Sequence, residues 1–292
     1  MNHKGSANCR ADSPSPGANA SGAIDEKATG AHASVTYNSY ARMDELLRLR
    51  QPVTGADTEP SFIVLSQVQE LLFSLLVTEF ELVRSQLHHD DLDGALWTIR
   101  RTVRIQSLAT NSWDALSALS PNEFLEIRPI LGTASGIQSL SYRKLEFLLG
   151  NRDSDVLARY KNTEAYKELT DVASEPSVYD EALSLLRRMG AFAPSEQTSR
   201  HGDQEASSDP SAVEAWRAVY VDRSLDRRLV LLAEALVDVA ECFGRWRYHH
   251  LLVVQRQLGM KGGTGGTSGV DWLRKISDHR FFAELWDART ML

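Results

Sequence analysis

The sequence is poor in the residues that several classes of protein require. It has two cysteines, Cys9 and Cys242, and no Cys-x-x-Cys pair, which excludes a disulfide framework and a cysteine-based zinc site. It has no apolar segment near Met1 and no run of about eighteen uncharged apolar residues, so we expect a cytoplasmic protein with no membrane partner. Its formal net charge is −7, and its basic residues are not clustered, which argues against a nucleic-acid partner.

Alternating apolar and polar residues, the signature of strands, are also absent. Residues 1–33 consist mostly of Ser, Ala, Gly, Asn and Pro, and we expect a disordered tail there. The rest, 34–292, has helical periodicity throughout and is predicted to form a single all-α domain, a helical bundle. Within it, 190–211 is rich in loop-forming residues and is a candidate mobile insert.

The helices can be placed from their apolar spacing and their caps. Residues 61–87 are apolar nearly all round, so this helix is predicted to lie deep in the bundle. Ser120, Pro121 and Glu123 form a capping box that starts a helix. The other expected helices are 93–119, as one helix or two, 137–149, two within 152–189 around Pro176, 212–258 and 271–289.

The stretch 246–270, WRYHHLLVVQRQLGMKGGTGGTSGV, combines a buried imidazole with a glycine-rich loop. His250 lies four residues after Trp246 and four before Val254, on one apolar stripe, so its ring should point inward. Gly259 is expected to end the helix. Such a histidine is more often a hydrogen-bonded core residue than a ligand. The loop fits no phosphate-binding fingerprint, so a nucleotide site is not expected.

Three further features have a structural and a functional interpretation. Ser66 in a buried helix usually donates back to its own backbone. Arg128, in an apolar setting, needs an anionic partner, which is either a structural carboxylate or the carboxylate of a ligand. Tyr37 and Tyr40 either pack under a helix start or serve a site.

The residues W-R-Y-x-H at 246–250, G-x-K-x-G-T-G-G-T-S-G-V at 259–270 and FFAELWDAR at 281–289 closely resemble the C-terminal signature of tryptophan 2,3-dioxygenases. The resemblance extends back to TYNSYARMDELL at 36–47. It implies an all-α enzyme that carries haem b in its core, uses O2 and acts on L-tryptophan or a substituted tryptophan. No Cys-x-x-Cys-His occurs, so this haem would have no thioether links.

The resemblance also implies roles for individual residues. His250 would be the axial ligand of the iron, with Trp113 and Tyr142 close to the haem. Arg128 and Thr264 would hold the carboxylate and amino group of the substrate. The indole would be enclosed by Phe62, Phe124, Ser135 and Gly136, and by Tyr37 and Tyr40 from a neighbouring subunit. An exchanged N-terminal arm of this kind implies a homo-oligomer, a tetramer built as a dimer of dimers.

One departure bears on the reaction. The family has a histidine in the pattern I-H-Q-x-x-E-L, which hydrogen-bonds the indole N–H, and here that position is Ser66. A hydroxyl can accept a hydrogen bond but is a poor base near neutral pH. We therefore keep dioxygenation to N-formylkynurenine, mono-oxygenation to an oxindole-type product in secondary metabolism, and a non-catalytic haem and tryptophan sensor as alternatives. Ser66, Arg128 and Thr264 are the candidate catalytic residues.

Overall fold

The computed structural model describes residues 35–191 and 209–292. Every regular element within these residues is helical, which confirms the all-α prediction. The chain divides into two compact units, 1–47 and 48–292. The predicted tail, 1–33, and all of the predicted insert except 190–191 and 209–211 lie outside the described residues. The predicted single domain from 34 to 292 stays a prediction.

The first unit contains two short helices, α1 (Tyr37–Ala41) and α2 (Met43–Arg48). Thr36 caps α1 through a capping box, and Arg42, at φ 51°, separates the two helices. Neither helix has a buried residue. Tyr37 and Tyr40 are 73% and 82% exposed.

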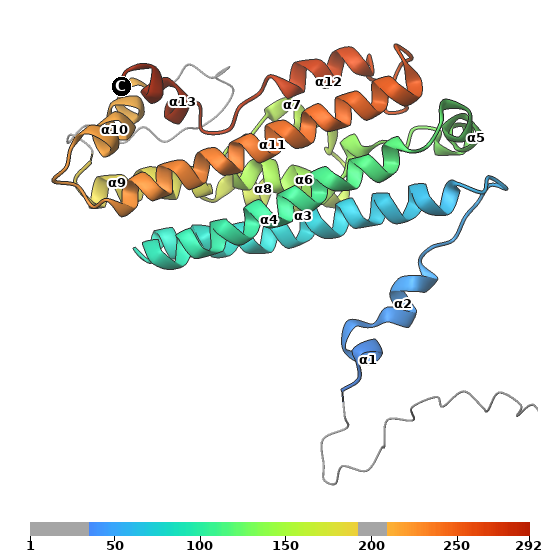
Figure 1. Ribbon diagram of the computed structural model, residues 1–292, viewed down its shortest axis with the longest axis horizontal. Helices are drawn as coiled ribbons and strands as arrows, with labels where there is room; N and C mark the ends of the chain where they lie inside the picture. The colour runs from blue at the N-terminus through green and yellow to red at the C-terminus, as the bar shows by residue number, and fades with distance from the viewer. Residues whose placement is uncertain (1–34, 192–208) are drawn as a thin grey trace, which may run out of the picture. The chain divides into compact units, whose positions relative to one another are not determined.

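Three long helices run side by side and form the centre of the second unit (Figure 1). They are α3 (Glu59–His88), α4 (Leu92–Ser117) and α11 (Arg228–Leu258). The helix predicted over 61–87 is confirmed. Region 93–119 forms one helix rather than a pair, which begins where the Asp91 side chain accepts a hydrogen bond from the Gly94 N–H.

The prediction that α3 lies deep in the bundle is wrong. One face of α3 packs on α4, α6 and α9, and Phe80 and Val83 on that face are fully buried. The opposite face leaves Leu71, Leu75 and Leu82 54%, 44% and 44% exposed. By length and composition alone, α3 is also apolar enough to cross a membrane, a test that core helices of soluble proteins pass as well.

The remaining helices are shorter and pack around the three long ones (Figure 1). The region 152–189 forms three helices rather than two, and 212–258 forms two rather than one. A 3₁₀ turn precedes the helix expected at 137–149, and 271–289 is divided in two. These elements are α5 (Pro121–Leu131), η1 (Gly136–Gln138), α6 (Leu140–Leu148), α7 (Ser154–Arg159), α8 (Glu164–Ser174), α9 (Val178–Arg188), α10 (Pro210–Val221), α12 (Val270–Ser277) and α13 (Ala283–Thr290).

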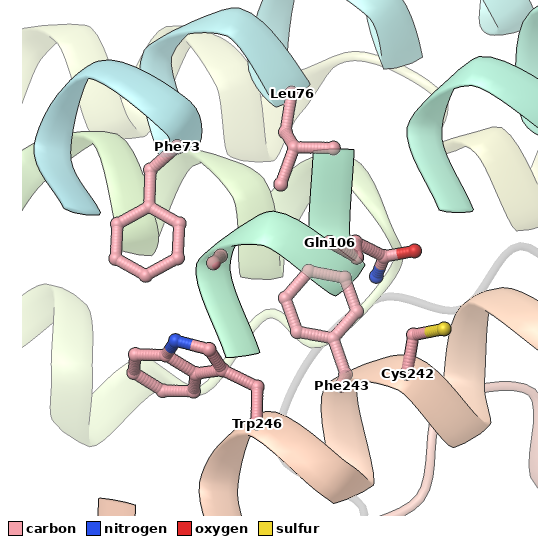
Figure 2. Close-up of a pocket in the computed structure, with 7 residues that line it drawn as sticks. Phe73, Leu76, Gln106, Cys242, Phe243 and Trp246 are labelled. Atoms are coloured by element: carbon pink, nitrogen blue, oxygen red, sulfur yellow. The ribbon is translucent and has the colours of Figure 1, made fainter. Parts of the chain in front are cut away.

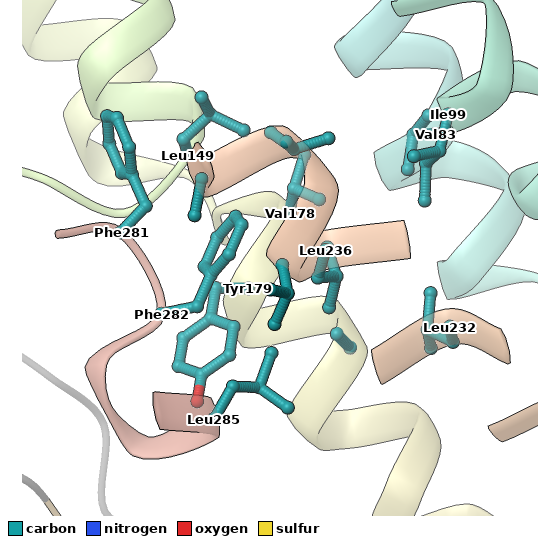
Figure 3. Close-up of a cluster of buried hydrophobic side chains, with 14 of the residues drawn as sticks. Val83, Ile99, Leu149, Val178, Tyr179, Leu232, Leu236, Phe281, Phe282 and Leu285 are labelled. Carbon is teal, nitrogen blue, oxygen red and sulfur yellow. The ribbon is translucent and has the colours of Figure 1, made fainter. Parts of the chain in front are cut away.

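The main core lies between the three long helices and the shorter helices packed on them. It is built from leucine, valine and aromatic side chains (Figure 3). Leu232 and Leu236 of α11 and Tyr179 of α9 contribute to it, with Phe281 and Phe282 from the segment before α13. Burial at about 25 cal/mol per Å² of apolar surface makes this packing the main stabilising term. It fixes α11, the helix that carries His250.

Candidate functional site

His250 lies in α11 against two indole rings. Its ring is parallel to that of Trp113 in α4, with centroids 4.5 Å apart and an interplanar angle of 6°. Trp246, one helical turn earlier, lies 5.6 Å away at 49°. Beyond Trp246 come Phe73 and Tyr142, each with its centroid 5.2 Å from the indole. We call this set the aromatic region: Phe73, Trp113, Tyr142, Trp246 and His250.

The surroundings of His250 favour its uncharged form. Burial lowers the pKa of the imidazole to about 4, because the charged form loses its hydration. The ring is therefore neutral at pH 7 and keeps a lone pair available for a metal. No hydrogen bond to this ring occurs among residues 35–191 and 209–292. The interpretation of His250 as a hydrogen-bonded core histidine is thus not supported.

Trp113 provides a test of whether a haem would fit here. Its indole N–H is buried and has no hydrogen-bond partner within the described part of the chain. A buried donor without a partner is costly, and a ligand with an anionic group would satisfy it. A haem has carboxylates for such a donor, and its iron needs only one imidazole from this face. The residues of the aromatic region therefore fit the cofactor that the resemblance implies.

Tyr142 contacts Trp246 rather than His250. It stacks on Trp246, and its hydroxyl accepts a 3.0 Å hydrogen bond from Arg247 Nε. Burial raises the pKa of this phenol to about 12. Among the ring contacts of the described residues, none joins Tyr142 directly to His250, because Trp246 stands between them.

A small cavity adjoins the aromatic region between α3, α4 and α11 (Figure 2). Phe73 and Trp246 form part of its wall, with Gln106 and Cys242 on other sides. Its volume of about 10 Å³ is close to the room that one water needs, so it cannot hold an indole or a haem.

Two loops meet at a second set of predicted residues. Arg128 Nη2 donates to the Gly262 carbonyl at 2.7 Å, and Thr264 Oγ1 donates to the Ala134 carbonyl at 2.7 Å. We call this set the loop region: Arg128 with residues 132–138 and 262–269. The two loops are more than a hundred residues apart in the sequence; the Thr264 bond joins them directly, and the Arg128 bond joins α5 to the second loop.

Glycine is required at two positions in the loop region. A Cβ on Gly265 would lie 2.8 Å from the Ser135 Cβ, so the two loops can approach this closely only without a side chain there. Gly269 has φ +67°, and a Cβ on it would lie 2.6 Å from the Lys261 carbonyl oxygen. Ser135 caps the η1 turn, and Gly136 begins that turn as an exposed residue.

The polar groups of the loop region are only partly used. None of the ion pairs in the described residues involves Arg128, so the alternative of a structural carboxylate partner is not supported. Its other guanidinium nitrogens are available to a ligand carboxylate. The Thr264 hydroxyl donates to Ala134, and its oxygen can still accept a hydrogen bond from an ammonium group.

Phe62, Ser66 and Phe124 lie on α3 and α5. The rings of Phe62 and Phe124 are 5.8 Å apart at 58°. Ser66 Oγ donates to the Phe62 carbonyl at 2.8 Å, as expected of a serine that bonds back to its own helix. Its oxygen retains acceptor capacity. Tyr37 and Tyr40 belong to the first unit, which is described by itself.

Four residues near these regions were not singled out from the sequence. Arg247 is 2% exposed and donates to Glu146 Oε1 at 2.9 Å, and Arg143 forms an ion pair with the other carboxylate oxygen. Gln69 accepts from Trp246 Nε1 at 3.0 Å. The only sequence signal was a polar residue inside an apolar helix pattern, and Arg247 lies within the W-R-Y-x-H string itself.

Comparison with known proteins points to the same family that the sequence resembles. A family model described as tryptophan 2,3-dioxygenase matches residues 23–194 and 195–292. A tryptophan 2,3-dioxygenase of Bradyrhizobium sp. strain BTAi1 is 39% identical over 261 residues, 88% of this chain and 93% of the relative. One from Erythrobacter litoralis is 39% identical over 259 residues, 88% of this chain and 98% of the relative. One from Bacillus thuringiensis subsp. konkukian is 36% identical over 260 residues, 89% and 92%.

Proposed function

The chain belongs to the tryptophan 2,3-dioxygenase family and is an oxidoreductase, and we propose that it uses haem b and O2 to cleave the indole C2–C3 bond of L-tryptophan. The observation that carries the proposal is the His250 imidazole, which is stacked on Trp113 and has no hydrogen bond within the described residues. His250 is the proposed protein ligand that would hold the haem iron. Trp113 is the proposed donor to a haem carboxylate.

The chain's own residues would bind and orient the amino acid. Arg128 would hold the α-carboxylate through the nitrogens that Gly262 leaves unused, and the Thr264 oxygen would accept from the α-ammonium group. Phe62 and Phe124 would pack on the indole, and Ser66 would accept a hydrogen bond from its N–H. Ser135 and Gly136 would complete the wall. This positioning would hold the indole with its C2 and C3 atoms toward the co-substrate O2.

Bound haem would supply the activation of O2, the step that no side chain here can perform. In dioxygenation both oxygen atoms enter the product, N-formylkynurenine, and all the electrons come from the substrate. The protein contributes orientation and, through its aromatic side chains, exclusion of water.

A second candidate function rests on Ser66. Mono-oxygenation would place one oxygen atom on the indole to give an oxindole-type product and reduce the other to water. That reaction needs two electrons and two protons from an external reductant. A serine in place of the family's histidine removes one anchor for the indole N–H and leaves room for a substituted tryptophan.

The deciding experiment is mass spectrometry of the products from reduced, haem-loaded protein given L-tryptophan and ¹⁸O₂. The expected result is a ring-opened product with two labelled atoms. One labelled atom, obtained only when a reductant is supplied, would replace the proposal by mono-oxygenation. A Soret shift on adding tryptophan without any product would indicate a sensor. The Ser66→His variant is the matched control for the effect of the missing histidine.

We also propose that the protein is a cytoplasmic homo-oligomer, a tetramer in which the arm at 35–47 is exchanged between subunits. Leu71, Leu75 and Leu82 form an exposed apolar stripe on α3, and the arm buries none of its own residues. A second copy of the chain would cover the stripe. Light scattering after size-exclusion chromatography should give a tetramer for the wild type and a smaller species for Leu75→Glu. A wild-type monomer would contradict the proposal.

A further inference from the structure

Gln69 of α3 joins three long helices through a single side-chain amide. Its Oε1 accepts from Trp246 Nε1 of α11 at 3.0 Å. Its Nε2 donates to the Ala109 carbonyl at 3.0 Å and to Ser112 Oγ at 2.8 Å, both in α4. An indole N–H can only donate and a backbone carbonyl can only accept, so the orientation of the amide is determined by its partners.

The Trp246 indole is the ring that this amide holds. It is 8% exposed, and its neighbours are Phe73, Trp113, Tyr142 and His250. Ring contacts constrain the position of an indole but tolerate some rotation in its plane, whereas a hydrogen bond to its only polar atom fixes that rotation. The amide of Gln69 is therefore the directional element in a set of otherwise non-directional contacts.

We propose that Gln69 is a positioning residue that sets the orientation of the Trp246 indole and, through it, the ring plane of His250. The His250 ring contacts both Trp113 and Trp246, so a rotated Trp246 would allow the imidazole to rotate against Trp113. The placement of the two rings does not depend on a cofactor. The consequence for an axial ligand rests on the proposed function.

The substitutions separate this role from general support of the bundle. Gln69→Leu removes both the oxygen that accepts from Trp246 and the nitrogen that donates to α4. Ser112→Ala removes one donor-side partner and leaves the bond to Trp246, so it is the matched control. Trp246→Phe removes the indole N–H that donates to Gln69. If Gln69 acts through Trp246, the Gln69→Leu/Trp246→Phe double variant should be no worse than the more affected single variant.

The first measurement uses full-length protein without added haem. The chain has six tryptophans, so ¹⁵N labelling gives six indole N–H signals, and Trp246→Phe identifies one of them. In Gln69→Leu this signal should lose about fivefold or more in hydrogen-exchange protection, the loss expected for one buried hydrogen bond. The ring-proton shifts of His250 should move as well, because a parallel indole imposes a large ring-current shift. Ser112→Ala should leave both unchanged.

The second measurement uses the haem-loaded protein. Gln69→Leu should shift or broaden the iron–histidine stretching band in the resonance Raman spectrum, and kcat should fall more than KM for tryptophan rises. Unchanged His250 ring shifts in Gln69→Leu, or additive effects in the double variant, would overturn the proposal. Wild-type protein that binds no haem would contradict the proposed function but would leave the first measurement decisive for Gln69.

Discussion

In the aromatic region, ring side chains from α3, α4, α6 and α11 are fixed by contact with one another, whereas in the loop region Arg128 and Thr264 are each fixed by one hydrogen bond to a backbone carbonyl. The first arrangement depends on packing across the bundle. The second depends on how closely two loops approach. Substitutions in the first should therefore alter cofactor binding and stability, and those in the second should alter the binding of the amino acid.

The largest effect is expected from His250→Ala. Removing the proposed axial ligand should weaken haem binding by more than about 100-fold, since even residues that only orient a metal ligand are worth about 10- to 100-fold. Haem titration followed by the Soret band measures this. His249→Ala is the matched control, because it changes the adjacent imidazole on the same helix. Equal haem loss in both variants, or normal haem binding in His250→Ala, would contradict the assignment.

The buried ion pairs beside the aromatic region give the next largest effect. Glu146 pairs with both Arg143 and Arg247, and all three are at most 6% exposed. Glu146→Gln would leave two buried guanidinium groups without their counter-charge, so the free energy of unfolding should fall by about 3–5 kcal/mol. Urea denaturation measures it.

The control for that substitution lies nearby. Lys144 lies on α6, the helix that also carries Glu146, and its ion-pair partner Glu168 has a side chain that is 53% exposed. Glu168→Gln should change the free energy of unfolding by less than about 1 kcal/mol. Similar losses in both variants would mean that burial does not decide the contribution of these pairs.

Arg128→Ala tests the loop region. A charged hydrogen bond is worth about 1.5–3 kcal/mol, so KM for tryptophan should rise about 10- to 100-fold with little change in stability. Tryptamine, which lacks the carboxylate, is the control substrate, and its KM should barely change. A large loss of stability would show that the bond to the Gly262 carbonyl matters more than a ligand does.

The effect that Tyr142→Phe isolates is a change in how stability depends on pH above 10. Because the pKa of the folded phenol is raised to about 12, the folded state holds its proton while the unfolded state releases it near pH 10. This group's contribution to stability is therefore present below pH 10 and is lost as the pH rises to about 12. The slope of stability against pH between 10 and 12 should be less steep in Tyr142→Phe than in wild type. Parallel slopes would contradict the burial argument.

Elements set by local signals could be predicted from the sequence. The capping box of Ser120 and Glu123 starts α5, and Gly259, at φ +60°, ends α11. The break between α7 and α8 was missed because it contains neither proline nor glycine, and the left-handed residue there is Asn162, at φ +70°. Exposure of one face of α3 was missed because apolar content alone does not show what covers a helix.

The composition of the candidate site was predicted mainly by resemblance rather than by spacing. His250 and Trp246 are one turn apart, so their proximity follows from helical geometry. Gln69 and Trp246 are 177 positions apart, and no local pattern joins them. The alternative in which Ser66 bonds to its own helix is what the structure has, and the carboxylate partner suggested for Arg128 is not among the described residues.

The close approach of Gly265 to Ser135 has a consequence for anyone who redesigns this protein. A larger side chain at position 135 would push against the backbone of the next loop, and the residue beside Gly265 is Thr264. With the roles proposed for Ser135 and Thr264, the space beside the indole and the contact to its amino-acid group both depend on this approach of the two loops. A library that varies position 135 alone is therefore expected to change both, and paired changes in the two loops are the way to alter one of them separately.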